Sequence, residues 1–295
     1  MAKIYTIMFF ISLALFIASV VALASYGLNL GVDFKGGSVI ELEFKEQPAI
    51  EEVQNTFRSV AELKDKELSL NSVGERGVLI RTDALTEDEH QKLLQALNRK
   101  FPGVQEKRFD SVGPAVGKEL RRKSLTAIII VLVAVIAYIA LVFRKLSRTL
   151  SLWAMMGATV VGLLHDIVIP MGVFAVLSRF YGVQISAVFV AAILTILGYT
   201  VSDKVVIFDR VRENIIRGAK DDLGSIVHRS VMQTLVRSIN NTLTVILSSL
   251  AIFLFGGESI RYFALALIIG IALGAYSSIF VAAPLMVWWS RKRQA

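Results

Sequence analysis

Cysteine is absent from this sequence, which excludes disulfide bonds, thiolate nucleophiles and cysteine-based metal sites. Histidine is scarce, with three residues in a chain of 295. Charged residues make up only 19% of the chain, whereas hydrophobic residues make up 55% and the mean hydropathy is +0.62. This balance is too apolar for a soluble domain of this length, and the polar residues are concentrated in one block. We therefore predict a membrane protein with one soluble insert.

The formal net charge of +8 does not indicate a nucleic-acid-binding protein. The polar block, residues 26–124, contains 16 Lys and Arg against 17 Asp and Glu, a net charge of −1, and the remainder contains 16 against 7, a net charge of +9. A positive excess at the ends of apolar segments is typical of membrane orientation, and the insert has no basic face of the kind that nucleic acid requires. We expect no nucleic-acid partner.

Apolar windows of about 20 residues predict six transmembrane helices. They lie at residues 4–23, 125–143, 152–177, 183–208, 243–255 and 262–289. The fifth window is short, so its helix must bring Arg237 and the polar residues 238–242 towards membrane depth, where they should face protein or water. Residues 211–235 have one apolar and one charged side, which predicts an interfacial helix along the inner surface with His228 on its wet face.

Basic residues set the expected orientation, with both termini in the cytoplasm and the insert outside. The segments assigned to the inner side carry Lys3, Arg144, Lys145, Arg148, Arg210, Arg212, Arg217, Lys220, Arg229, Arg237, Arg291, Lys292 and Arg293. Four basic residues at the outer end of the second span, Lys118, Arg121, Arg122 and Lys123, disagree with this assignment. The first span has a plausible cleavage triplet at 22–24, but its long apolar run favours an uncleaved anchor.

The predicted domain organisation follows from these assignments. Residues 1–26 form the first transmembrane helix and 27–124 the external, periplasmic-side domain. Residues 125–290 form a five-helix membrane domain with a cytoplasmic loop at 209–239, and 291–295 form a basic tail.

The external domain has the periodicity of a small α+β fold. Alternating and amphipathic patterns predict strands at 38–44, 67–73, 76–82 and 104–112, with helices at 49–63 and 86–101. Thr86 and Glu89 predict a capping box, and His90 is interpreted as a helix-surface residue. This βαββαβ order predicts a ferredoxin-like unit. The insert has no Ser/His/Asp cluster, metal-ligand spacing or phosphate-binding glycine loop, so we expect no enzyme, no metal and no cofactor.

Asp203 lies within an otherwise apolar run at 183–208, where a carboxylate costs roughly 2.5 to 3.5 kcal/mol on insertion scales. One interpretation is a structural ion pair with the adjacent Lys204 or with Arg210. The other is an aspartate that binds and releases a proton as it gains and loses a cationic partner. Arg237 is the candidate partner because it is expected at a similar depth; the alternative for Arg237 is contact with inner-leaflet headgroups.

His165 and Asp166 form a second polar group, in the third predicted span. They lie roughly 20 Å from its inner end, against about 8 Å for Asp203 in the fourth, so direct contact with Asp203 is not expected. One interpretation is an interhelical hydrogen bond that steadies a kink at Pro170, and the other is a role in a proton relay.

Five segments together resemble the SecF family, the smaller subunits of the bacterial SecD/SecF protein-export complex. They are GLNLGVDFKGG at 27–37, SVGPAVGKEL at 111–120, HD at 165–166, GYTVSDKVVIFDRVREN at 198–214 and QTLVRSINNTLTVILSSLAIFLFGG at 233–257. The resemblance places the family's membrane aspartate on Asp203 and its arginine on Arg237. Where the family commonly has Asn-Asp-Thr, this chain has Ser202-Asp203-Lys204, and an adjacent lysine could hold the carboxylate ionised.

The resemblance implies a six-span inner-membrane protein of the resistance-nodulation-division superfamily. Its implied partners are an obligate SecD-like subunit, the SecYEG translocon, a small YajC-like membrane subunit and unfolded secretory polypeptides. It implies that proton or sodium motive force promotes late export, with Asp203, Arg237, His165, Asp166 and Lys204 as the ion-coupling candidates. A non-transporting scaffold that stabilises the translocon is the alternative, and half of a small-molecule exporter is a third, disfavoured because the single insert is small.

Overall fold

The structure is a computed structural model that describes residues 3–144, 151–219 and 221–291. Of the basic residues assigned to the inner side, Lys145, Arg148, Lys220, Lys292 and Arg293 lie outside the described residues. The chain divides into two compact units: Met1–Asn29 with Thr126–Ala295, which we call the membrane unit, and Leu30–Leu125, which we call the outer unit.

The membrane unit is helical, and in the described residues of the chain six helices are long and apolar enough to cross a membrane. They are α1 (Lys3–Tyr26), α5 (Pro114–Phe143), α6 (Leu152–Tyr181), α7 (Ala187–Ile216), α8 (Leu223–Phe255) and a last helix made of α9 (Glu258–Ser277), a π-helical turn (Ser278–Ala282) and α10 (Ala283–Arg291). The prediction of six spanning helices is therefore confirmed.

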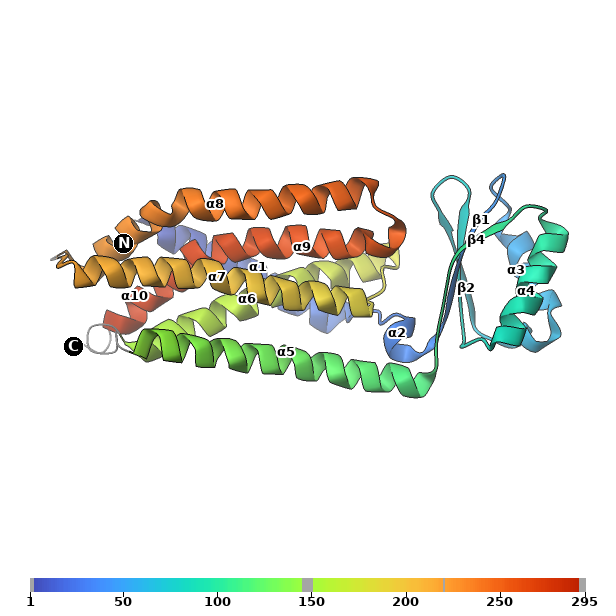
Figure 1. Ribbon diagram of the computed structural model, residues 1–295, viewed down its shortest axis with the longest axis horizontal. Coiled ribbons are helices and arrows are strands. Elements are labelled where there is room, and N and C mark those ends of the chain that lie inside the picture. Colours follow the sequence, from blue (N-terminus) through green and yellow to red (C-terminus); the bar gives the residue numbers. More distant parts are fainter. Residues whose placement is uncertain (1–2, 145–150, 220, 292–295) are drawn as a thin grey trace. The chain divides into compact units, whose positions relative to one another are not determined.

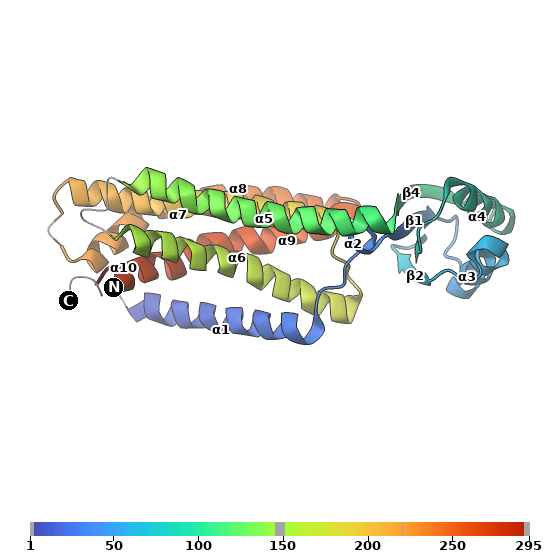
Figure 2. The same cartoon turned by 90° about the horizontal axis from the view of Figure 1, so that it is seen from below.

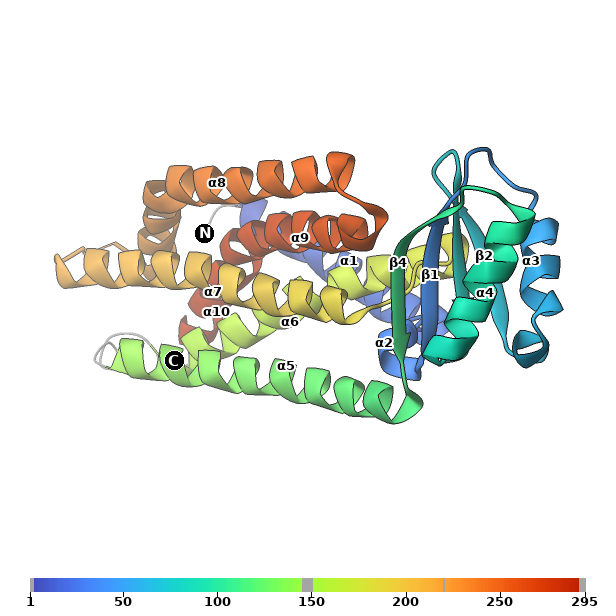
Figure 3. The same ribbon diagram turned by 45° about the vertical axis from the view of Figure 1, so that its right-hand side comes forward.

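The prediction of one separate helix at 211–235 is wrong. Its first residues continue α7 to Ile216, and the rest begins α8, which is one helix from Leu223 to Phe255. The 33 residues of α8 measure about 50 Å along the helix axis, and the helix bends near its start (Figure 3). The amphipathic pattern arises because Ile226, Val227 and Val231 pack against the end of α7, while His228 is exposed and bonded to Tyr5.

The helices α6, α7 and α9 form the centre of the membrane unit. About half of the most apolar stretch of each is buried, against 6% for α5, 11% for α1 and 17% for α8. Figure 2 shows α1 running beside α6, where an added Cβ on Gly172 would lie 2.4 Å from Ser19 Cβ. Gly270 and Gly274 let α9 pack closely on α7, because added Cβ atoms there would lie 2.2 Å from Ile196 Cδ1 and 1.9 Å from Thr200 Cγ2.

The outer unit has the predicted ferredoxin-like order. Its strands are β1 (Gly37–Glu43), β2 (Leu68–Val73), β3 (Gly77–Thr82) and β4 (Gln105–Val112), and its helices are α3 (Ile50–Ser59) and α4 (Glu87–Lys100). The strands form an antiparallel sheet in the order β2-β3-β1-β4, and α3 and α4 cover one face of it (Figure 3). Ile40 and Leu42 from the sheet and Phe57, Leu93 and Leu97 from the helices form its core.

A short helix that the sequence analysis missed, α2 (Val32–Lys35), precedes the sheet. It ends at two consecutive glycines with positive φ, Gly36 (+86°) and Gly37 (+132°). An added Cβ would meet Pro114 Cα at 2.7 Å from the first glycine and the Thr82 carbonyl oxygen at 2.7 Å from the second. Only glycine fits both the backbone conformation and the space at these positions.

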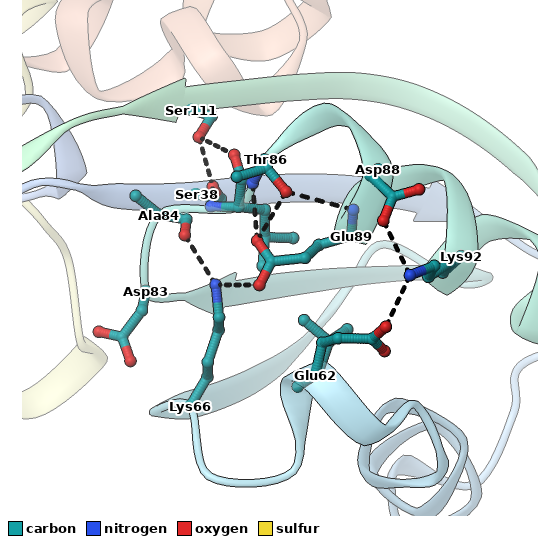
Figure 4. A network of polar contacts seen from close by, with 12 residues as sticks. Ser38, Glu62, Lys66, Asp83, Ala84, Thr86, Asp88, Glu89, Lys92 and Ser111 are labelled. Atoms are coloured by element: carbon teal, nitrogen blue, oxygen red, sulfur yellow. Dashed lines mark hydrogen bonds and ion pairs between the residues drawn. The ribbon is translucent and has the colours of Figure 1, made fainter.

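The start of α4 carries a polar network that links three segments of the outer unit (Figure 4). The capping box is confirmed, because the Glu89 amide donates to Thr86 Oγ1 and the Thr86 amide donates to the Glu89 carboxylate. Lys66 forms an ion pair with the same carboxylate at 2.8 Å. The buried Ser38 hydroxyl accepts from the Leu85 amide and donates to Ser111, which ties β1 and β4 to this helix start.

The interpretation of His90 as a surface residue is wrong. His90 is 4% exposed, its Nε2 lies 2.7 Å from Glu106, and its ring stacks on Phe109. The reason is its position three and seven residues before Leu93 and Leu97, which places it on the face of α4 that packs on the sheet.

Candidate ion-coupling site in the membrane unit

Asp203 and Lys204 are consecutive residues of α7, and both are buried. Consecutive side chains on a helix point about 100° apart, so each meets a different neighbour. Lys204 points towards α6 and α9, whereas Asp203 lies beside Ser238 of α8. Lys204 therefore does not pair with the aspartate next to it.

Lys204 instead neutralises Asp166. Its Nζ lies 2.6 Å from Asp166 Oδ2, and both side chains are fully buried. The other oxygen of this carboxylate, Oδ1, lies 3.0 Å from His165 Nδ1. The ammonium also donates to Ser277 Oγ at 3.0 Å and to the Thr200 carbonyl oxygen at 3.5 Å. The pair thus joins α6, α7 and α9, and it forms the interhelical hydrogen bond that was one interpretation of Asp166.

The expected difference in level between the two polar groups was wrong. We placed the inner end of the fourth span at Phe208, but α7 continues to Ile216 because residues 209–216 remain helical. Asp203 is 216 − 203 = 13 residues from that end, and Asp166 is 166 − 152 = 14 residues from the start of α6 at Leu152. The two carboxylates therefore lie at similar levels, and Lys204 reaches the one on the other helix.

Asp203 faces a small cluster of uncharged polar groups between α7 and α8. Ser238 lies beside its carboxyl, and Tyr199, one turn earlier on α7, lies beside Thr242, one turn later on α8. Asp203 Oδ2, Ser238 Oγ, Tyr199 Oη and Thr242 Oγ1 are all buried and make no hydrogen bond among the described residues. We call these four side chains the α7–α8 polar cluster. Asp203 lies close to Ser238 and Tyr199 lies close to Thr242, but neither pair has good hydrogen-bond geometry. Buried polar groups without a well-formed hydrogen bond are rare in proteins and need an explanation.

Neither arginine proposed for Asp203 pairs with it. Arg210 bonds to Gln233 and Glu213. Arg237 directly precedes Ser238 on α8. Its side chain is exposed and forms no ion pair or hydrogen bond with any described residue. The structure thus brings together His165, Asp166 and Lys204. Asp203 and Arg237 lie on the neighbouring helices α7 and α8, but their side chains do not meet.

Sequence reasoning missed several residues of this site. Ser277 gives no signal, because serine at a helix–helix contact is common in membrane proteins. The α7–α8 polar cluster could have been found, since Tyr199 and Asp203 have the same four-residue spacing as Ser238 and Thr242. Two polar residues four apart lie on one helix face, so each pair predicts a polar stripe on its helix.

Comparison with known sequences identifies the family. The model for "Protein export membrane protein SecD/SecF, C-terminal" matches residues 92–292, and the model for the "SecD/SecF GG Motif" matches residues 21–48. Protein translocase subunit SecF of Thermobaculum terrenum is 39% identical, over 96% of this chain and 92% of that protein. SecDF of Brucella abortus is 36% identical over 93% of this chain, which matches only 35% of that longer protein.

Solved structures agree with the sequence relatives. The crystal structure of SecDF from Thermus thermophilus, a translocon-associated membrane protein, matches 97% of this chain with a TM-score of 0.80 at 29% identity. SecDF in its super-membrane-facing form matches 98% with a TM-score of 0.67 at the same identity. This chain covers 38% of each of those chains. With its six spanning helices and ferredoxin-like outer unit, the chain belongs to the SecF family of protein translocase subunits and is a multi-pass membrane protein of the Sec pathway.

Proposed function

We propose that this chain uses ion-motive force to promote a late step of protein export, with Asp203 as the group that binds and releases the coupling proton. The observation that carries the proposal is that two buried carboxyl groups at similar levels have different neighbours. Asp166 has a fully buried lysine on one oxygen and a histidine on the other. Among the described residues Asp203 forms no ion pair, and its carboxyl lies beside the Ser238 hydroxyl, with the charge of Lys204 acting on it only from a distance.

This environment suits a carboxyl group that changes protonation state. Burial without a counter-ion favours the neutral form, and an approaching cation favours the ionised form. Arg237 is the candidate cation, since it is adjacent to Ser238, and a rotation of α8 about its axis by roughly 100° would bring its side chain to the face that meets α7. A membrane potential supplies roughly 2.3 kcal/mol per charge per 100 mV, enough to bias two arrangements of a helix bundle. Movement of α8 against α7 would follow each proton transfer.

A SecD-like partner is supported by the exposed polar side chains of α8. Arg237, Asn241, Thr244 and Ser248 are all exposed in this chain and recur every three or four residues, so they lie on one face of a spanning helix. Polar groups facing hydrocarbon are costly, whereas a partner helix or a water-filled path would accommodate them. The SecDF relatives contain a region like this one together with further sequence in one chain.

The remaining assignments belong to the same proposal. We place the chain in the bacterial inner membrane with both termini in the cytoplasm and the outer unit on the periplasmic side. It would act beside the SecYEG translocon, with a YajC-like subunit as a further member, on unfolded secretory polypeptides. The outer unit would act as a binding or lever element, because its described residues form a packed core and surface ion pairs.

The decisive experiment replaces Asp203 with Asn in cells that depend on the plasmid-borne chain. The appearance of a pulse-labelled secretory protein outside the inner membrane is measured with and without an uncoupler. We expect export to fall to the uncoupled level, because asparagine keeps the shape but cannot exchange a proton. The matched control is Asp209→Asn, on the same helix, whose exposed carboxylate pairs with Arg212.

The two outcomes separate the proposal from its alternative. If Asp203→Asn accumulates normally, binds its partner and exports at the wild-type rate with a wild-type response to the uncoupler, the chain is a scaffold. A second comparison addresses the cation: Arg237→Met is expected to impair export more than Arg261→Met, which removes a guanidinium that lies over the Phe253 ring. Equal effects of the two would remove the special role of Arg237.

A further inference from the structure

The groups around the Lys204 ammonium are those that bind a small cation. Its three N–H donors meet a carboxylate oxygen of Asp166, the hydroxyl oxygen of Ser277 and the main-chain carbonyl oxygen of Thr200, at 2.6, 3.0 and 3.5 Å. Hard cations are bound by carboxylate, carbonyl and other oxygen ligands of this kind. The lysine therefore places its charge in an all-oxygen environment that three different parts of the fold supply.

The surrounding chain is shaped to hold this charge. Gly162 lies one turn before Asp166 on α6, and a Cβ there would come within 2.5 Å of Lys204 Cε, so the lysine stem needs this glycine. The Ser277 hydroxyl donates to the Gly274 carbonyl at 3.1 Å, which leaves its lone pairs for the ammonium. A π-helical turn begins at the next residue, and such turns are frequent at functional sites.

We propose that Lys204 is a tethered cation that fills a monovalent-cation site formed by Asp166, Ser277 and the Thr200 carbonyl, and that truncating Lys204 converts it into a sodium site. One carboxylate supplies one negative charge, so a single monovalent cation balances it once the ammonium is gone. His165 continues to donate to the other carboxylate oxygen and holds the group in place.

The Lys204 ammonium bears on which ion can couple to export. With Lys204 in place, sodium cannot enter the centre between α6, α7 and α9, so this chain would not bind sodium there. That consequence for export rests on the proposed function of Asp203. The cation site itself does not, because it can be tested by binding alone.

The test compares purified full-length wild type with Lys204→Ala and Lys204→Met in detergent. The thermal unfolding midpoint is measured in sodium chloride and in choline chloride at the same ionic strength, and retention of radioactive sodium is measured directly. Alanine removes the charge and leaves space, whereas methionine fills the space of the stem. We expect Lys204→Ala to bind sodium saturably and to gain about 5 °C or more at saturation. Wild type and Lys204→Met should do neither.

Two further variants define the site. Asp166→Asn in the Lys204→Ala background should abolish the sodium response, because the carboxylate is the charged ligand. Lys66→Ala is the matched control, since it also removes a lysine from a carboxylate, in the outer unit, and should give no sodium response. Lys204→Ser serves as a second truncation if the alanine variant does not accumulate.

The results decide between a cation site and a purely structural pair. A folded Lys204→Ala or Lys204→Ser that neither binds sodium nor gains stability from it overturns the inference. Failure of both variants to fold in high sodium overturns it too, because a filled site would neutralise Asp166. These outcomes are independent of export: loss of export in Asp203→Asn with no sodium binding in Lys204→Ala would support the proposed function and reject this site.

Discussion

Ion pairs in the outer unit and the Lys204–Asp166 pair in the membrane unit use the same chemistry under opposite conditions. Lys92 of the outer unit pairs with Glu62 and Asp88, but its side chain is 43% exposed. Lys204 and Asp166 are both 0% exposed. When a solvated ion pair loses one partner, water can take the place of that partner. A buried charge that loses its partner has no such substitute. Burial, not the number of contacts, should decide which pairs matter.

The largest effect is expected for Lys204→Met. Removing one partner of a buried pair costs roughly 3–5 kcal/mol in the free energy of unfolding, because Asp166 is left charged or must take up a proton. Adding Asp166→Asn should recover most of that loss, since the double variant has no buried charge at this position. Chemical denaturation of the four purified proteins in mixed micelles gives the coupling energy. A double variant as unstable as Lys204→Met would contradict this account.

An intermediate effect is expected for Glu89→Gln in the outer unit. Its carboxylate is 16% exposed, and the Lys66 ammonium, followed by the Thr86 amide, lowers the pKa of Glu89 below its ordinary value of 4.5. A lowered pKa in the folded state means that the stabilisation is complete at neutral pH and is lost as the pH falls through the folded-state value. Glutamine keeps the capping geometry but not the charge, so we expect a cost of roughly 1 kcal/mol at neutral pH.

Hydrogen exchange of the α4 amides in the intact chain measures this cost. Wild type and Glu89→Gln are compared at the same pH, first near neutrality and then well below 4.5, where the difference should disappear. Glu87→Gln is the control, because Glu87 lies in the same first turn with its side chain 72% exposed. A difference that persists at low pH would show that the charge of Glu89 is not its cause.

The same contrast explains what the sequence could predict. The strands, the hairpin and the capping box of the outer unit follow from patterns a few residues long, and the structure has them within one or two residues at most ends. The helix α3 is shorter than predicted and is followed by a separate turn at Ala61–Leu63. Local periodicity carries this information because each strand and helix shows its buried face in its own residues.

The direction of Lys204 could not be predicted in this way. Its neighbour in the sequence is Asp203, but its partner is Asp166, 38 residues away on another helix. Which carboxylate the lysine reaches depends on the rotation of α7 and on how far that helix extends, and the apolar run ends at Phe208 while the helix ends at Ile216. Because the apolar run and the helix end at different residues, the difference in level that the apolar runs implied between Asp166 and Asp203 was wrong.

The smallest effect is expected for Lys92→Met, although Lys92 has two carboxylate partners. Asp88 and then Glu62 raise the pKa of this lysine. While the two carboxylates are ionised, the pairs therefore contribute fully below the ordinary lysine value of 10.5, and they lose their contribution as the pH rises through the raised one. At neutral pH all three groups are charged but solvated and screened by salt. We expect a small loss of hydrogen-exchange protection in α4 at low ionic strength and none at high ionic strength. A loss as large as that of Lys204→Met, or one that salt does not reduce, would mean that contact number outweighs burial in this protein.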